Sequence, residues 1–342
     1  MRGSVVITDA EERAVLGACR GLTDAGYRVC AVARLRPAAT HWSRACAERL
    51  TLPDPRESVV GFVTRLEEVL RQGDYDALIP GSDASLLAVS EHRGRLERWT
   101  RLGLPSAEAV HRSVDKLLLL EAAADAGLAA PASRRCTDLE QAREAVAELG
   151  YPVVLKPVQS FVPVNGGLRQ RGVTVAADLQ ALAAMVPRLD PPFIVQRFEE
   201  AEGFLSCTGV VADGRLLALT TSRVLRLWPP GAGMHAFSET VPVPDGLAGS
   251  VRALLASLEW QGIFQLQMLE LADGRLAVID LNPRVFASIA LDADAGANLA
   301  AVWCDWLLGR DPAPVVARPA RRFRWEEGEL CHFAWQLRHR RL

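Results

Sequence analysis

Short apolar runs alternate with helical segments over the first 105 residues, and this alternation restricts the fold more than any other feature. Strand-like runs occupy residues 4–7, 28–33, 49–52 and 76–80. Helical patterns over residues 10–25 and 57–72 separate them. This order predicts a parallel sheet covered by helices. The turn Gly81-Ser82-Asp83 follows the last strand, at the edge of the sheet where ligands usually bind. No GxGxxG pattern follows the first strand, so a dinucleotide site is not indicated.

The composition is that of a globular chain large enough for more than one core. The 342 residues are 49% apolar and 23% charged. A net charge of −2 does not indicate nucleic acid or a membrane as partner, and the apolar runs are too short to span a bilayer. No signal-peptide pattern precedes the first strand, so we expect a cytoplasmic location. Seven scattered cysteines without a CxxC pair predict reduced thiols, not disulfides or a zinc site.

A Leu-Pro-Ser boundary at 104–106 separates this region from a longer mixed segment. We expect helices over residues 106–112, 115–127, 138–150, 178–187, 246–259 and 297–308. We expect strands at 151–157, 173–175 and 193–198, and two antiparallel hairpins, within 203–224 and within 264–282. Both hairpins turn at Asp-Gly pairs, which favour tight turns. The tail from 311 is rich in proline and arginine and predicts a solvated arm with one helix near 328–340.

The chain has only two lysines among its 39 basic residues. Lys116 begins a predicted helix, and Lys156 ends a predicted strand just before the glycine-containing loop 160–172. An ammonium is a compact point charge that the planar guanidinium of arginine does not replace. Next to a glycine loop, such a charge suits nucleotide phosphates. Chance retention of two lysines under GC-rich coding is the alternative.

Polar side chains cluster on the last predicted hairpin. Gln267 lies on its first strand, and Asp280 and Asn282 lie two residues apart on its second. Residues i and i+2 of a strand share a face, so their oxygens project the same way, with Arg284 close behind. One carboxylate, two amide oxygens and a guanidinium suit magnesium and phosphate together. A surface hairpin with a solvated polar face is an equally compatible interpretation.

Four segments in order resemble one known family. These are DKLLLLEAAADAGLAAPAS, YPVVLKP, FIVQRFEEAEGF and FQLQMLELADGRLAVIDLNPR. They are similar to the ATP-grasp superfamily, in particular its carbamoyl-phosphate-synthase-like and carboxylate–amine ligase members. The resemblance implies an α/β fold, with a parallel pre-ATP-grasp domain followed by a two-lobed ATP-grasp fold. The implied divisions are 1–105 for the first domain, 106–190 for the lid, 191–310 for the large subdomain and 311–342 for the tail.

The resemblance also implies a role for each matching residue. Lys116 and Lys156 would contact the α- and β-phosphates of ATP. Gln196, Arg197 and Phe198 would form the hinge against adenine, and Glu202 would bind the ribose. Gln267, Asp280 and Asn282 would bind Mg²⁺ or Mn²⁺, and Arg284 would stabilise the transferring phosphoryl group.

Three departures from the family pattern concern the same region. Asp280 replaces the usual glutamate, and Gln267 stands where an acid is common, although synthase-type members also use glutamine there. The loop 160–172 is poorer in glycine than in many members and carries Pro163. With one carboxylate in a site that usually holds two metal ions, we expect weak binding of the second ion or reduced activity.

The implied reaction is ATP-dependent joining of a small carboxylate to an amine through an acylphosphate, with release of ADP and phosphate. A homo-oligomer is compatible with the resemblance. Arg223 and Arg226 are candidates for holding the carboxylate, although solvated surface arginines explain them as well, and Asp83 is a candidate for contacting the amine. The alternatives are a kinase or carboxylase on the same fold, and a regulatory nucleotide-binding protein with a weakened metal site. The sequence names neither substrate.

Overall fold

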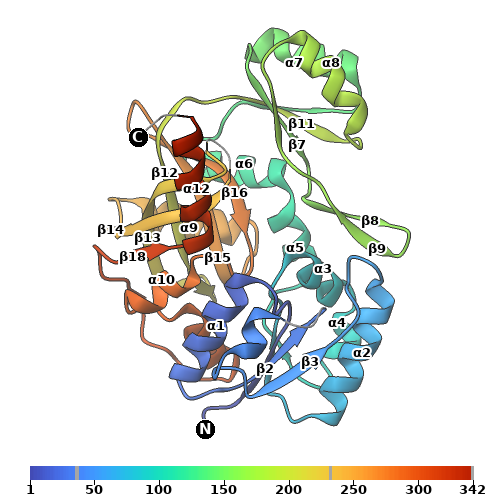
Figure 1. Cartoon of the computed structure of the whole chain (residues 1–342), viewed down its shortest axis with the longest axis vertical. Coiled ribbons are helices and arrows are strands. Elements are labelled where there is room, and N and C mark those ends of the chain that lie inside the picture. Colours follow the sequence, from blue (N-terminus) through green and yellow to red (C-terminus); the bar gives the residue numbers. More distant parts are fainter. Residues whose placement is uncertain (35–37, 231–232, 340–342) are drawn as a thin grey trace.

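The computed structural model describes residues 1–34, 38–230 and 233–339 (Figure 1). The chain forms three parts: a first domain, a lid above it in Figure 1, and a large domain beside both. The first domain is a parallel sheet in the order β3-β2-β1-β4-β5. Its strands are β1 (Ser4–Ile7), β2 (Arg28–Ala33), β3 (Glu48–Thr51), β4 (Ala77–Ile79) and β5 (Arg101–Leu102). Its helices are α1 (Arg13–Asp24), η1 (Ala39–Trp42), α2 (Val59–Gln72), α3 (Asp83–Glu91) and α4 (Arg93–Leu96). The parallel α/β prediction for this domain is confirmed.

Two helices connect the first domain to the lid. They are α5 (Ala107–Val114) and α6 (Lys116–Asp125). The side chains of Ser106 and Asp115 cap their first turns, as expected for serine and aspartate at these positions. The sequence groups both helices with the lid, but α6 packs against α9 (Leu247–Ser257) and β16 (Leu276–Asn282) of the large domain.

The lid has a small antiparallel sheet in the order β10-β7-β11-β6, with its own apolar core. Its strands are β6 (Ser133–Cys136), β7 (Val153–Pro157), β10 (Thr174–Ala176) and β11 (Phe193–Arg197). Its helices are α7 (Leu139–Leu149), α8 (Leu179–Met185) and η2 (Val186–Arg188). The predicted loop 160–172 instead contains a hairpin, β8 (Phe161–Val164) and β9 (Gly167–Gln170), which reaches down to the first domain in Figure 1. Asn165 and Gly166 turn this hairpin with positive φ angles of 51° and 82°.

The large domain is a mostly antiparallel sheet in the order β16-β15-β12-β13-β14-β18, with β17 beside β13. Its remaining strands are β12 (Ala201–Ala212), β13 (Arg215–Trp228), β14 (Met234–Val241), β15 (Gly262–Leu271), β17 (Val315–Val316) and β18 (Arg322–Arg324). Its remaining helices are α10 (Ile289–Asp294), α11 (Leu299–Leu307) and α12 (Glu326–Arg338). Both predicted hairpins form, β12–β13 and β15–β16.

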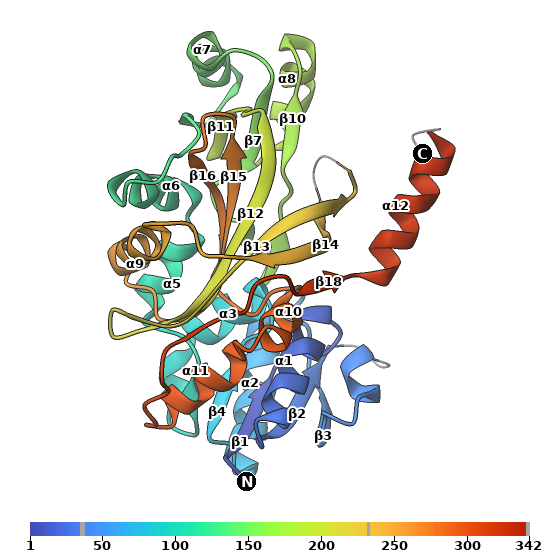
Figure 2. The same ribbon diagram turned by 90° about the vertical axis from the view of Figure 1, so that its left-hand side faces the viewer.

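The C-terminal tail differs from the expected solvated arm. Strand β18 adds to the edge of the large sheet by pairing with β14, so the backbone groups of this segment are satisfied by the sheet. Helix α12 then projects away from the body (Figure 2). Arg226 on β13 holds its first turn through two hydrogen bonds to Glu329, both 2.7 Å long.

Apolar packing unites the first and large domains more tightly than the lid. Two clusters of buried side chains each contain residues of both domains, for example Val5 with Trp303, and Val6 with Phe264. The lid core is separate. All seven cysteines are free thiols, as predicted. In the three described ranges, no helix combines the length and apolar character needed to cross a membrane.

Candidate functional site

Two cavities lie where the three parts meet. The upper cavity, of about 710 Å³, lies between the lid sheet and the large sheet. The lower cavity, of about 490 Å³, is lined by the first domain, the β8–β9 hairpin, the large sheet and the start of α12. Residues that line both are Gly233, His235, Gln267 and Asp280. The two cavities are therefore neighbours that share one wall, and the predicted hairpin residues stand at the junction.

Both lysines reach strand β16 from different elements. Lys116, the first residue of α6, forms an ion pair with Asp280. Lys156, in β7, donates a hydrogen bond of 3.3 Å from Nζ to the backbone carbonyl of Ile279. Each lysine is only 8% exposed, and both line the upper cavity. Residues far apart in the sequence thus bring two ammonium groups to one side of the cavity.

The environment of Lys156 favours loss of its proton. Burial lowers the pKa of its ammonium to about 8, the nearby Asp280 charge opposes this shift, and Lys116 adds to it. A buried cation with a backbone carbonyl as its hydrogen-bond acceptor gains from a negatively charged ligand. The two lysines are therefore suited to bind an anion in the upper cavity.

The predicted hinge runs along the same cavity. Gln196 is buried, and its side-chain Nε2 donates to Ser133 Oγ over 2.9 Å. The backbone N–H of Arg197 donates to Ala132, and that of Phe198 to Pro152. These three residues line the upper cavity together with Glu199 and Glu200. Because two hinge N–H groups are already bonded within the lid, contacts to a ligand base would use other polar groups of this segment.

Glu202, the predicted ribose ligand, is separated by the structure from the predicted hinge residues. It lies exposed at the start of β12 and is not among the residues lining the upper cavity. Glu199 and Glu200 occupy the position beside the cavity. The acidic run 199–202 indicates a carboxylate here, but sequence spacing alone does not select which one faces inward.

The register of the β15–β16 hairpin aligns the predicted oxygen donors. Gln267 faces Asp280, and Gln265 faces Asn282. The side chain of Asn282 donates to Gln265 Oε1 over 3.0 Å, and Gln265 in turn donates to Ser206. The sequence analysis missed Gln265, although its position two residues before Gln267 places it on the same face. The four polar side chains of the hairpin, Gln265, Gln267, Asp280 and Asn282, all line the lower cavity.

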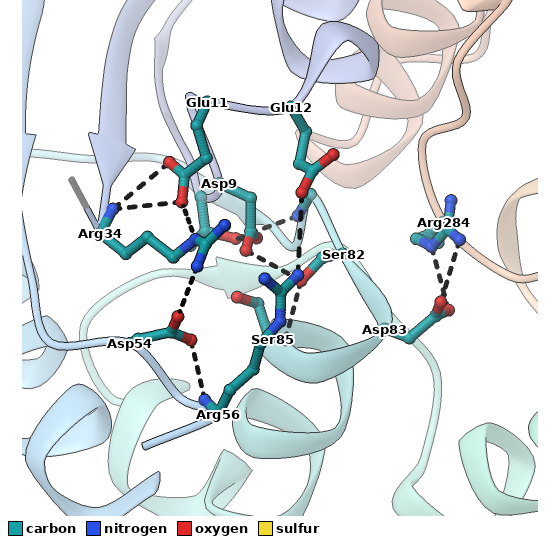
Figure 3. A network of polar contacts seen from close by, with 12 residues as sticks. Asp9, Glu11, Glu12, Arg34, Asp54, Arg56, Ser82, Asp83, Ser85 and Arg284 are labelled. Atoms are coloured by element: carbon teal, nitrogen blue, oxygen red, sulfur yellow. Dashed lines mark hydrogen bonds and ion pairs between the residues drawn. The ribbon is translucent and has the colours of Figure 1, made fainter. Parts of the chain in front are cut away.

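Arg284 and Asp83 join these side chains to the first domain. Arg284 donates from Nε and Nη2 to the two carboxylate oxygens of Asp83, over 3.0 and 2.9 Å (Figure 3). Arg284 Nη2 also donates to Asn282 Oδ1 over 2.9 Å. The two residues predicted to touch different substrates therefore contact each other.

Gly81 allows this approach of the first domain. A Cβ atom at this position would lie 2.2 Å from the backbone oxygen of Thr8 and 2.6 Å from a methyl carbon of Val15. Only glycine lets the chain pass β1 so closely. Ser82 then caps α3, and Asp83 begins the helix at the rim of the lower cavity.

Known sequence relatives match part of the chain. The carbamoyl phosphate synthase large chain of Rubrobacter xylanophilus is 33% identical over 191 residues, which is 54% of this chain and 17% of that protein. The corresponding chain of Thermotoga neapolitana is 28% identical over 250 residues, 67% of this chain and 22% of that protein. This chain therefore spans less than a quarter of the length of either relative. No protein-family profile matches it.

Solved structures match nearly the whole chain. An ADP complex of N5-carboxyaminoimidazole ribonucleotide synthetase superposes with a TM-score of 0.71 at 15% identity, covering 93% of this chain and 80% of the other. The chain has the ATP-grasp fold. The L-amino acid ligase of Bacillus licheniformis shares this ATP-grasp architecture, with a TM-score of 0.70 at 14% identity, 94% coverage of this chain and 78% of the other. These likenesses establish the fold.

Two further predicted residues lie outside the residues that line the cavities. Arg223 pairs with Glu270 through hydrogen bonds of 2.9 and 2.7 Å, and Arg226 holds Glu329 of α12. Neither lines the upper or the lower cavity. Arg223 joins two strands of the large sheet, and Arg226 joins the sheet to α12. Their role as carboxylate ligands remains a prediction.

The two cavities contain residues that the sequence analysis did not select. Arg13, Arg56 and Trp325 line the lower cavity. His235 lines both cavities, and burial, together with the nearby Arg13 charge, lowers the pKa of its imidazole to about 4. This histidine is therefore neutral at physiological pH. No sequence motif marks any of these residues, because distant segments bring them together.

Proposed function

We propose that this chain is an ATP-dependent enzyme that activates a small carboxylate as an acylphosphate and joins it to an amine. The observation that best supports this proposal is that Gln267 and Asp280 line both cavities. One cavity offers two lysines, and the other offers polar and charged groups from three parts of the chain. This arrangement suits transfer of a phosphoryl group from one compartment to a substrate in the other.

The residues of the upper cavity fit ATP. Its volume of about 710 Å³ lies in the range of nucleotide and cofactor sites. Val154, Val173, Val175 and Leu269 give it apolar surface for a base, and Lys116 and Lys156 supply positive charge for phosphates. The side chains of Glu199 and Glu200 are candidates to bind ribose hydroxyls, in place of or together with Glu202.

The oxygen donors fit one magnesium or manganese ion held together with nucleotide phosphates. Asp280 supplies a carboxylate, and Gln267 and Asn282 supply amide oxygens. Mg²⁺ commonly uses one or two carboxylates, water and substrate phosphates, not a complete protein cage. Within the described residues, no group of three or more histidine, cysteine or acidic side chains forms a metal site. A second ion would therefore depend mainly on phosphate and water. A bound divalent ion would neutralise phosphate charge during transfer.

The protein groups have distinct tasks in this proposal. Lys116 is released from Asp280 when phosphates and metal bind, and then contacts phosphate. Arg284 stabilises charge on the transferred phosphoryl group. The lid and its hairpin exclude water from the acylphosphate, which hydrolyses readily. The amine attacks the acyl carbon, and phosphate leaves.

Oxygen labelling tests this mechanism directly. Acids and amines are screened singly and in pairs for ADP release, and the productive acid is then labelled with ¹⁸O in its carboxylate. One label should appear in inorganic phosphate, and hydroxylamine should convert the acid to a hydroxamate. A stable phosphorylated product without labelled phosphate would indicate a kinase. Amide formation without transfer of label would exclude the acylphosphate.

A regulatory nucleotide-binding protein is the second candidate, and one observation favours it. Asp280, the one carboxylate among the predicted metal ligands, is paired with Lys116. If that pair persists with nucleotide bound, metal binding would be weak. This candidate predicts ATP binding with no ADP release above background in any acid and amine mixture. Small-molecule substrates, a homo-oligomer and a cytoplasmic location remain predictions from the sequence.

A further inference from the structure

The lower cavity combines opposite charges from separate segments. Arg13, Arg56 and Arg284 line it, and so do Glu12, Asp83 and Glu327. Arg284 is paired with Asp83, and Arg56 lies 3.7 Å from Glu12 (Figure 3). Arg13 differs from the other two arginines, because its side chain forms no hydrogen bond or ion pair with any described residue. Its Nε atom is buried and has no partner there.

Aromatic rings hold the Arg13 guanidinium in place instead. Its central carbon lies 4.2 Å from the ring centroid of Trp325 and 5.8 Å from that of Phe323. Stacking on an aromatic face leaves the N–H groups at the edge of a guanidinium free to donate. Arg13 is therefore a fixed cation with unused donors in a cavity.

The sheet fixes the tryptophan that supports this cation. The backbone N–H of Trp325 donates to the backbone oxygen of Ala236 over 2.8 Å, directly after the residues of β18 that pair with β14. Glu329, one turn later, is held by Arg226. Both the arginine and its stacking partner are thus positioned before any substrate binds, which reduces the entropy cost of binding.

Arg13 and Arg284 come from different walls of the lower cavity. Arg284 follows β16, beside Asn282 and the junction with the upper cavity. Arg13 begins α1 and lies against the C-terminal segment. If the reacting atoms lie at the junction, a group bound by Arg13 is a different part of the substrate.

We infer that Arg13 binds a carboxylate that takes no part in the reaction, carried by one of the two substrates. This inference rests on the proposed ligase function. A guanidinium with free edge donors matches a carboxylate through two parallel hydrogen bonds. The acidic side chains in the same cavity would repel a doubly charged phosphate more strongly than a singly charged carboxylate. The second carboxylate belongs either to the amine, as in an α-amino acid, or to the acid, as in a dicarboxylate.

Matched pairs of probes distinguish these two sources. In the amine arm, each standard α-amino acid is compared with its carboxamide. In the acid arm, succinate and glutarate are compared with their monoamides. The wild-type protein should prefer the carboxylate form in one arm, both in ADP release with ATP and in calorimetric binding with ADP present. If the protein binds the carboxylate and amide forms equally well in both arms, or prefers a phosphorylated substrate, the inference is overturned.

Substitution of Arg13 tests its role in that preference. Arg13→Gln should weaken the carboxylate form by about tenfold to a hundredfold, because it removes a charge-assisted contact. It should leave the carboxamide form and the KM for ATP within about threefold of wild type. Arg13→Lys should restore part of the affinity, because it keeps the charge without the fork. Equal losses for the carboxylate and carboxamide forms would refute the assignment.

Variants at two other positions separate binding from folding. Arg20→Gln removes an exposed arginine from the same helix and should change no binding parameter. Trp325→Ala removes the aromatic face and should weaken the carboxylate form more than the carboxamide form, and Trp325→Phe should restore part of that loss. Calorimetric binding that depends on Arg13 without any ATP turnover would reject the ligase proposal and retain this site. ATP turnover that does not depend on Arg13 would retain the ligase proposal and reject this site.

Discussion

Arg284 and Asp83 share two hydrogen bonds across the boundary between the large domain and the first domain, and both side chains are about four-fifths buried. This pair orients the guanidinium beside Asn282. We predict that Asp83→Asn lowers the free energy of unfolding by about 1–3 kcal/mol, because it leaves a partly buried charge without its partner. It should also lower kcat by about tenfold with little change in the KM for ATP, because misplacing a group acts on turnover. Urea unfolding and steady-state kinetics measure the two effects.

A second arginine–carboxylate pair with two hydrogen bonds serves as the matched control for Arg284 and Asp83. Arg223 and Glu270 have the same geometry but lie away from both cavities, with half of the arginine side chain exposed. Glu270→Gln should cost less than about 1 kcal/mol and leave turnover unchanged, since exposed pairs contribute little. If the two variants behave alike, the Arg284–Asp83 pair has no special role in turnover.

Lys156 should contribute strongly to nucleotide affinity. Lys156→Ala removes a buried ammonium from the upper cavity and should weaken ADP binding by about 1.5–3 kcal/mol. Lys156→Arg should restore only part of this loss, because a planar fork does not replace a point charge. Calorimetric titration with ADP measures both. Wild-type affinity in both variants would show that Lys156 does not bind phosphate.

The pKa of Lys156 predicts a pH dependence of the same binding reaction. With a pKa of about 8, this ammonium loses its proton as the pH rises from 7 to 9. ADP affinity should fall by about tenfold over that interval, with proton uptake on binding. Between about pH 8 and 10 the unfolded state binds more protons at this group, so its contribution to the free energy of unfolding rises with pH. Lys156→Arg should abolish the change in affinity, and an unchanged profile would refute the assignment.

Asp280 is predicted to control metal dependence. Asp280→Asn removes the carboxylate from the row Gln267, Asp280 and Asn282, and should abolish magnesium-dependent turnover without unfolding the chain. Asp280→Glu keeps a carboxylate on a longer side chain and should retain activity or bind magnesium more tightly. Turnover measured against magnesium concentration, with circular dichroism as the folding control, decides this. Normal turnover of Asp280→Asn at low magnesium would contradict the role.

Local signals in the sequence account for most of the fold. Apolar runs and caps predicted β1, β2 and β7 and the starts of α5, α6 and α7 closely, because each signal lies within a few residues of the element that it specifies. The structure of the C-terminal tail was harder to predict from the sequence. Its strand β18 is three residues long and depends on β14 for pairing, so its order comes from a distant part of the chain.

The candidate site divides in the same way. Asp280 and Asn282 could be placed together because strand periodicity puts them on one face, and the predicted hairpin brings Gln267 beside them. The Lys116–Asp280 and Arg284–Asp83 contacts could not, because they join residues that are 164 and 201 positions apart. Arg13 and Trp325 lie farther apart still in the sequence, and only packing of β18 beside the first domain brings them into contact.

The β8–β9 hairpin links the lid to the first domain through its backbone. Val59 donates to Gly166, and Leu168 donates to Arg56, while Phe161 and Leu168 are almost fully buried. Raising the lid would break these two bonds and expose both side chains, at a cost of a few kcal/mol. The hairpin contacts are therefore ones that must open if the lid lifts from the first domain. In the reaction proposed above, a variant with weaker hairpin contacts should lose acylphosphate to water, and should release ADP without forming an amide.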